Sequence, residues 1–152
     1  MAYVWKTYQY KTDANVAGKV CEELQKTIGL SAENLVNASR AEDAPLHEEF
    51  EWDNDVAAEE YRKVQAGNMI RNLSIVIEDV PTNEPVRAFF NLTRKSGLYE
   101  NTIEIMTDRS KTEVLLNIAL RELNVFKEKY KALKELADIF QAIDKVQSEH
   151  RV

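Results

Sequence analysis

Few side chains in this sequence have the chemistry of a catalytic nucleophile, a general base or a metal ligand. The two histidines are His47, inside an acidic segment, and His150, near the C-terminus. The single cysteine, Cys21, falls at an apolar helix position, where a packed thiol is expected rather than a reactive thiolate. The four glycines are too far apart to form a phosphate-binding loop, and no pair of carboxylates has a setting that predicts a raised pKa. The sequence therefore predicts no catalytic residue, no cofactor and no metal site.

An acidic and aromatic segment, residues 41–54, is the first candidate for a binding surface. Nine acidic residues lie between Glu42 and Glu60, and no basic residue lies between Arg40 and Arg62. Buried aromatic anchors give interfaces affinity, and complementary charge gives speed and selectivity. This segment supplies both kinds of group. The candidate partner-binding residues are Glu48, Glu49, Phe50, Glu51 and Trp52.

Two other interpretations of this segment stay open. In one, it is a structured connection whose aromatic residues pack on the core while a carboxylate at its end caps the following helix. In the other, the least favoured, it holds a metal ion. One histidine and loop carboxylates lack the fixed spacing of metal-ligand sets. The ligands would be His47 with Glu48, Glu51 or Asp53.

Basic residues concentrate in the middle of the chain. Residues 62–134 carry 13 basic and 9 acidic side chains, whereas residues 1–61 carry 5 basic and 13 acidic ones. Cations attract the phosphates of nucleic acids, so the middle block is the region suited to duplex DNA. The candidate DNA-binding residues are Arg62, Lys63, Arg71, Arg94 and Lys95.

Composition narrows the class of protein. The chain has 152 residues, 44% of them hydrophobic, and a net charge of −6, which suits one domain or a small domain with an extension. A single cysteine excludes an internal disulfide framework and fits a reducing compartment. No apolar run reaches the roughly 20 residues of a membrane span, and the N-terminus lacks a signal-peptide core. We expect a cytoplasmic protein.

The N-terminal part has the pattern of an arm followed by two helices. Alternating aromatic residues in the segment 2–11 predict an extended arm on the core, with a base-stacking platform as the other interpretation. A helix is predicted from Thr12 or Asp13 to Gly29, and a second over residues 32–40, capped by Ser31. This order of a helix, a glycine and a second helix fits either a structural hairpin or a helix-turn-helix motif, and many helical hairpins share it. The inner stripe predicted for the first helix is Val16, Val20, Leu24 and Ile28.

The next part changes from a helical to a strand pattern. A third helix is predicted over residues 55–72, with Tyr61 and Val64 among its inner residues. The apolar period then becomes two, which predicts strands over residues 73–77 and 86–92 that form a β-hairpin.

Two isoleucines, Ile103 and Ile105, predict a short third strand or an extended lead-in to the last helix. Three helices followed by a hairpin predict a mainly helical α+β fold. The first domain, residues 1–106, is expected to be winged-helix-like.

The last third of the chain, residues 110–146, contains neither glycine nor proline. Ser110 and Glu113 have the spacing of a capping box. Apolar residues follow at alternating spacings of three and four, as in a coiled coil. One long amphipathic helix is predicted, within a region 107–152 that pairs two chains into a homodimer. The predicted oligomerisation residues are Leu123, Phe126, Tyr130, Leu133 and Phe140.

A set of short motifs runs through most of the chain after residue 10. These motifs are Ala38-Ser-Arg40, Asp43-Ala-Pro-Leu-His47, Phe50-Glu-Trp-Asp53, Ala57-Ala58, Tyr61-Arg62, Lys129-Tyr130, Leu133 and Leu136-Ala137. The pattern resembles a family of small proteins encoded by phages and prophages. The resemblance implies a viral or mobile-element setting, and hence the cytoplasm of a host cell. It implies no activity and no functional residue.

Two functional hypotheses follow from the sequence. The first is a non-enzymatic, dimeric, DNA-linked regulatory protein. The alternative is an interaction protein that inhibits a basic host protein, of defence or regulation, through the acidic and aromatic surface.

Overall fold

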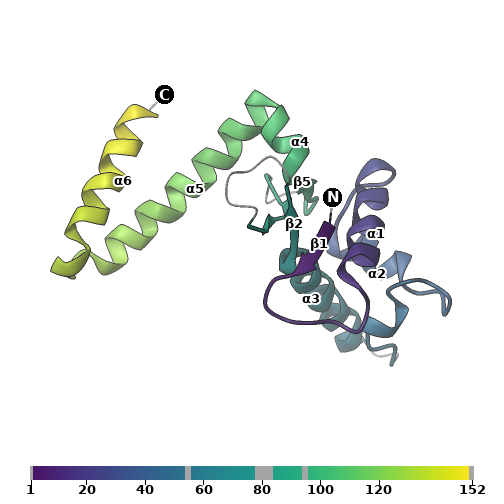
Figure 1. Cartoon of the computed structure of the whole chain (residues 1–152). Helices are drawn as coiled ribbons and strands as arrows, with labels where there is room; N and C mark the ends of the chain where they lie inside the picture. Colours follow the sequence, from purple (N-terminus) through teal and green to yellow (C-terminus); the bar gives the residue numbers. More distant parts are fainter. Residues whose placement is uncertain (1, 54–55, 78–83, 94–95, 151–152) are drawn as a thin grey trace. The chain divides into compact units, whose positions relative to one another are not determined.

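The computed structural model describes residues 2–53, 56–77, 84–93 and 96–150. The chain divides into two compact units, residues 1–107 and residues 108–152, one residue beyond the predicted division. The first unit mixes helices with short antiparallel strands, and the second is helical (Figure 1). The predicted α+β class is confirmed. Among the described residues, no helix is both long enough and apolar enough to cross a bilayer.

The first unit contains two small sheets. β1 (Ala2–Trp5) pairs antiparallel with β2 (Leu73–Val76), and β2 pairs with β3 (Val86–Arg87), so the predicted N-terminal strand and hairpin are confirmed. β4 (Phe89–Phe90) pairs instead with β5 (Glu100–Asn101). The predicted strand 86–92 is therefore split.

The split occurs at Ala88, which connects the two sheets. Its N–H donates to the Leu73 carbonyl at 3.0 Å, and its carbonyl accepts from the Thr102 N–H at 2.8 Å.

Three helices pack on the sheets or on one another: α1 (Ala14–Lys26), α2 (Ala32–Ala38) and α3 (Val56–Asn72). α1 and α3 contact strands, and α2 packs on α1 and α3. The predicted caps of the first two are confirmed. The Asp13 carboxylate accepts from the Asn15 N–H at 2.8 Å, and the Ser31 hydroxyl accepts from the Asn34 N–H at 3.0 Å. Gly29 follows α1 with a φ of +100°, a conformation that suits glycine.

The inner stripe predicted for α1 is correct at Leu24 but wrong at Val16 and Ile28, because the buried face lies about one position away. Ala14, Ala17, Cys21 and Leu24 are buried, while Ile28 is 67% exposed. Small residues face inward because β1 packs against this helix. A Cβ at Gly18 would lie 2.2 Å from the Tyr3 ring, so the aromatic side chain occupies the space that glycine leaves.

The predicted inner residues of α3 also need correction. Tyr61 and Val64 are 54% and 55% exposed, whereas Arg62 is buried with Ala66 and Ile70. The largest fully buried side chains of the first unit come from every part of it and include Leu30, Leu35, Leu46, Met69, Leu73, Ile75 and Phe89.

The predicted third strand at Ile103 and Ile105 is wrong. These residues lie in α4 (Thr102–Thr107), directly after β5. The Asn101 side-chain oxygen accepts from the Ile103 N–H at 2.9 Å, and the Thr102 hydroxyl donates to the Arg87 carbonyl at 2.5 Å. Short polar side chains that bond nearby backbone favour such a helix start over a strand.

The predicted single helix over residues 110–146 is wrong. α5 (Arg109–Tyr130) is followed by η2 (Lys134–Leu136) and α6 (Ala137–Glu149), and α6 packs back on α5. The chain turns at Leu133, whose backbone is extended. The capping residue is Asp108, whose carboxylate accepts from the N–H groups of residues 110 and 111, so the predicted capping box at Ser110 is also wrong.

Packing between α5 and α6 explains why a segment without glycine or proline turns back. Leu120 and Ile143 are buried, and the Phe126 and Phe140 rings lie 6.4 Å apart. Lys127 forms an ion pair with Asp144 on α6. These contacts outweigh the helix propensity of the residues at the turn.

Candidate functional site

The acidic segment is attached to the core by a buried arginine. Arg62 is 3% exposed. Its guanidinium donates to the Glu51 carbonyl, to the Asp53 carbonyl at 2.6 Å and to the Glu59 carboxylate at 3.0 Å. The five N–H donors of arginine can satisfy several acceptors at once, so one side chain fixes the end of the segment and the start of α3.

Trp52 completes this attachment. Its ring stacks on His47 with centroids 4.9 Å apart, and its indole N–H donates to the His47 carbonyl at 2.7 Å. The guanidinium carbons of Arg62 and Arg40 lie 5.0 and 5.7 Å from its ring centroid. Arg40 also pairs with Glu59 at 2.5 Å. The hydrogen bonds from Arg40 and Arg62 lower the pKa of the Glu59 carboxyl.

The predicted partner-binding residues separate into two groups. Phe50 is 6% exposed and belongs to the core, and Trp52 is half-buried, so the interpretation as a structured connection is correct for both aromatic residues. Glu49 is half-buried, and its carboxylate accepts from the Thr12 N–H and hydroxyl at 2.9 and 3.0 Å. Glu48 and Glu51 are exposed. The structure therefore leaves carboxylates, not aromatic anchors, on the surface here.

The three predicted DNA-binding residues that the structure describes, Arg62, Lys63 and Arg71, do not form one cationic surface. Arg62 is buried, which corrects its expected role as a phosphate contact. Lys63 pairs with Glu60 at 3.4 Å. Arg71 is exposed and donates to Asn68 at 2.7 Å and to the Tyr99 hydroxyl at 3.1 Å. Arg94 and Lys95 lie outside the described residues.

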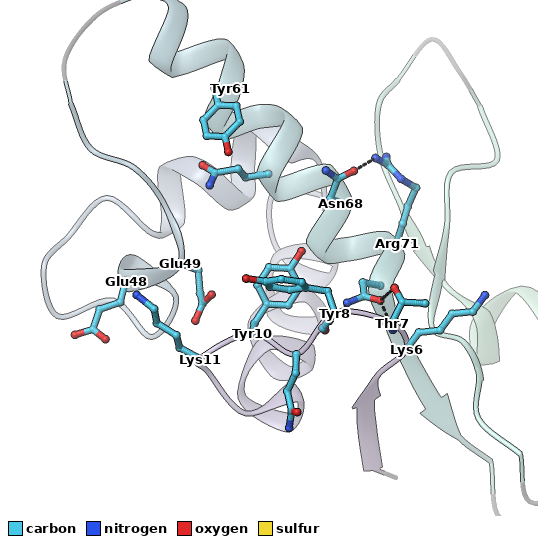
Figure 2. A pocket seen from close by; sticks show the side chains of 13 residues that line it. Lys6, Thr7, Tyr8, Tyr10, Lys11, Glu48, Glu49, Tyr61, Asn68 and Arg71 are labelled. Carbon is cyan, nitrogen blue, oxygen red and sulfur yellow. Dashed lines mark hydrogen bonds between the residues drawn. The ribbon is translucent and has the colours of Figure 1, made fainter.

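A groove of about 800 Å³ lies beside the acidic segment. Residues 6–11 form one wall, α3 contributes Tyr61, Gln65 and Asn68, and Glu48 and Glu49 lie at one end (Figure 2). Figure 2 shows Lys11 near these two carboxylates. The tyrosines of the first wall lie in the centre.

Asn72 fixes the wall formed by residues 6–11. Its side-chain oxygen accepts from the N–H and hydroxyl of Thr7 at 2.9 and 2.8 Å, and its amide donates to the Tyr8 carbonyl at 2.7 Å. Three rings then contact one another in series. The ring centroids of Trp5 and Tyr10 lie 4.5 Å apart in a tilted pair, and those of Tyr10 and Tyr8 lie 4.7 Å apart in an edge-to-face pair. Burial raises the pKa of the Tyr10 phenol.

Sequence reasoning missed this groove. Its walls are far apart in the sequence, and no local pattern joins residues 6–11 to Tyr61, Gln65 or Asn72. The one available signal was the aromatic N-terminal segment, which was expected to pack on the core. Trp5 and Tyr10 do so, while Tyr8 is 63% exposed.

Cys21 and His47, two side chains with potential chemistry, are constrained by their surroundings. Burial raises the pKa of the Cys21 thiol to about 12. His47 Nδ1 lies 2.9 Å from the Ser39 carbonyl, which can only accept, so this nitrogen carries a proton. Among the described residues, no group of three or more histidine, cysteine or acidic side chains is arranged to hold a metal ion.

The predicted oligomerisation residues lie around the α5–α6 hairpin. Leu123, Phe126, Tyr130 and Leu133 are exposed, and Phe140 is half-buried. Phe126 packs on both Tyr130 and Phe140 within the chain. The structure thus brings these residues together on one small unit, with much of their apolar surface uncovered.

Comparison of the chain with models of protein families, with curated proteins and with solved structures finds no match. The chemistry of the acidic segment, the groove and the hairpin is therefore the basis for a functional assignment.

Proposed function

We propose that this protein acts by binding, as a non-enzymatic interaction protein that engages a basic protein through the acidic segment. The single supporting observation is a set of exposed carboxylates on a backbone fixed by Arg62. Those carboxylates are Glu42, Asp43, Glu48, Glu51 and Glu60. A surface that is already ordered loses little conformational entropy on binding.

Charge supports a basic partner. Residues 1–107 carry 18 acidic and 11 basic side chains, a net charge of −7, whereas residues 108–152 carry 8 acidic and 9 basic ones. An acidic field increases the association rate of cationic partners and repels polyanions. The resemblance to small phage proteins supports a host protein as the target.

The test is affinity capture from host-cell lysate, with identification of the captured protein. The variant Glu48→Lys/Glu51→Lys is compared with wild type and with the control Glu23→Lys/Glu84→Lys, which reverses two exposed charges elsewhere. We expect wild type and the control to retain one basic protein, in a salt-sensitive manner, and the first variant to lose it. Equal capture by all three folded proteins would contradict the proposal.

DNA-linked regulation is a second proposal, supported by the order of α1, α2 and α3 followed by the β2–β3 hairpin. Phosphate contacts are strongest at low salt. Binding of the full chain to duplex DNA at low salt, lost on salt addition, is the expected result. An absence of binding at low salt would rule this function out.

A homodimer formed through the α5–α6 hairpin is the proposed assembly in either case. Among the described residues of this unit only Leu120 and Ile143 are buried apolar side chains. So small a core gives a two-helix unit little stability. Pairing two hairpins into a four-helix arrangement covers the remaining apolar surface.

A further inference from the structure

One end of the groove between residues 6–11 and α3 is cationic. Lys6 and Arg71 are exposed and lie on the same side of the groove in Figure 2. The Lys6 N–H donates to the Asn72 carbonyl at 2.9 Å, which fixes Lys6 beside the residue that follows Arg71. Neither Lys6 nor Arg71 forms an ion pair with another described residue. Two cations fixed side by side favour an anionic ligand.

The opposite end of the groove carries both signs of charge. Lys11 lies near Glu48 and Glu49 in Figure 2, and Glu49 already accepts two hydrogen bonds from within the chain. Because these carboxylates repel an anion, its favourable position is beside Lys6 and Arg71. The net charge of −7 over residues 1–107 also disfavours a long polyanion. The groove therefore suits a small anion better than a long nucleic acid strand.

An exposed aromatic ring lies next to the cationic end. Tyr8 is 63% exposed, its ring contacts Tyr10, and its carbonyl accepts from the Asn72 amide at 2.7 Å. Burial raises the pKa of the Tyr10 phenol, and the charge of Arg71 opposes this rise, so the guanidinium lies within electrostatic range of these rings. Lys6 and Tyr8 are two residues apart, so their Cα atoms lie within about 7 Å of each other.

A planar base joined to a phosphate fits this arrangement. Bases of every kind stack on aromatic side chains, and phosphates pair with lysine and arginine. The Asn68 side-chain oxygen accepts from Arg71, so its amide N–H group is the part that can donate to the edge of a base. The groove, of about 800 Å³, has the volume of a site for a small molecule.

We propose that this groove binds a nucleoside phosphate, with the base stacked on Tyr8 and the phosphate held by Lys6 and Arg71. The ligand is a free nucleotide or the phosphorylated end of a single strand, which present the same chemistry. Duplex DNA does not present it, because its bases are stacked on one another. This inference goes beyond the proposed function, since it concerns a different set of side chains from the carboxylates that engage a basic protein.

The test is a titration of the ¹⁵N-labelled full chain with adenosine 5′-monophosphate, followed by nuclear magnetic resonance. We expect the backbone N–H resonances of residues 6–11 and of Arg71 to shift, with a dissociation constant on the order of 0.1 to 1 mM. Adenosine lacks the phosphate, and ribose 5-phosphate lacks the base. Each should bind about tenfold more weakly, because charge-assisted hydrogen bonds and base stacking each contribute to the affinity of the nucleotide.

A single-stranded adenylate tetranucleotide with a 5′-phosphate distinguishes the two sources of the ligand. Because residues 1–107 carry a net charge of −7, we expect it to bind no more tightly than the mononucleotide, which assigns a free nucleotide to the site. Binding that is about tenfold tighter would assign the end of a single strand to the same site, because further bases and phosphates then contribute.

Variants test the aromatic and the cationic part of the site separately. Tyr8→Leu and Lys6→Ala should each weaken nucleotide binding about tenfold without a change in thermal midpoint, because both side chains are exposed. Tyr8→Phe keeps the ring and should retain binding. The matched control Lys19→Ala removes an exposed lysine of α1, outside the groove, and should leave binding unchanged.

Three outcomes would overturn the inference: no resonance shift up to about 10 mM nucleotide, equal binding of either fragment of the nucleotide, or unchanged binding by Tyr8→Leu. Failure here is distinguishable from failure of the proposed function, which depends on Glu48 and Glu51. Capture from lysate should be unchanged in Tyr8→Leu and lost in Glu48→Lys/Glu51→Lys.

Discussion

Arg62 shows how a single residue can reverse its expected role. Its position among basic residues predicted a contact with phosphate, yet it is buried and bound to two backbone carbonyls and Glu59. Its aromatic neighbour Trp52 is likewise part of the core region and not a free anchor. The acidic segment depends on this pair for its shape, so the two residues support the proposed binding surface without contacting a partner.

Removal of the Arg62 side chain should therefore destabilise the protein. Arg62→Ala leaves two carbonyls and one oxygen of the Glu59 carboxylate without their donor, while Arg40 still binds the other oxygen. We expect a loss of about 3 kcal/mol in the free energy of unfolding. Urea denaturation followed by circular dichroism measures this. Arg62→Lys should recover part of the loss, and Lys63→Ala, at a more exposed neighbouring position, should change stability by less than about 0.5 kcal/mol. Equal effects at positions 62 and 63 would contradict the assigned role.

The sequence predicted correctly those residues whose hydrogen-bond partners lie close to them along the chain. Asp13 and Ser31 were identified as helix caps because a cap needs only a side-chain oxygen and the next N–H groups. Gln65 and Asn72 carry no such signal, because their surroundings come from segments far along the chain. The position of Arg62 was read correctly as helical, but its burial depends on backbone carbonyls that no sequence pattern marks.

At the scale of elements, the sequence predicted where helices and strands occur better than where they turn. α1, α2, α3, β1 and the paired strands β2 and β3 lie within their predicted segments, although β1 and β3 are shorter than predicted. The predicted long final helix does not form as one helix. Its sequence contains no glycine or proline to mark a break, and the turn at Leu133 is imposed by packing between α5 and α6. A periodic apolar stripe is expected both for a helix that pairs with another chain and for a helix that packs against the next helix of the same chain. The stripe therefore does not distinguish the two arrangements.

The turn at Leu133 gives a distance that can be measured. Gln147 donates to the Leu120 carbonyl at 3.3 Å, so the end of α6 lies beside the middle of α5. Spin labels at Arg121→Cys and Ser148→Cys should give a distance on the order of 20 Å, whereas a continuous helix would separate these positions by about 40 Å. Pulsed electron–electron double resonance, which measures the distance between two spin labels, distinguishes the two values.

The spin-label experiment has two internal controls. Cys21 is buried with a raised pKa, so it should not react in the native protein, and the wild-type chain without added cysteines should remain unlabelled. Dilution of the labelled protein with unlabelled protein removes distances between chains. A distance near 40 Å that persists on dilution would show that α5 and α6 form one rod.

At the scale of the whole molecule, charge and apolar surface are divided between the two units. Residues 1–107 carry a net charge of −7, and residues 108–152 carry a net charge of +1 and expose apolar side chains. This division fits an acidic binding unit joined to an association unit. Two acidic units in one dimer would raise the apparent affinity for a partner with two binding sites.

Residues 108–152, the proposed dimer contact, contain an exposed leucine whose replacement tests the dimer. Leu123 is exposed on α5 beside Phe126. A carboxylate at this position would place charge in the apolar surface that the proposed dimer buries. Burial of each leucine contributes about 2 kcal/mol and the symmetric contact uses it twice, so Leu123→Glu should weaken dimerisation at least 100-fold. Arg121→Glu introduces the same side chain at an exposed polar position and should leave the dimer intact.

Sedimentation equilibrium over a range of concentrations measures both variants against wild type. Circular dichroism establishes that each keeps its helices, which is expected because position 123 is already exposed in one chain. A wild-type chain that stays monomeric at the highest concentration would refute the dimer. A dimer that both variants retain would place the contact elsewhere, since the charge at position 123 would then lie outside the surface shared by the two chains.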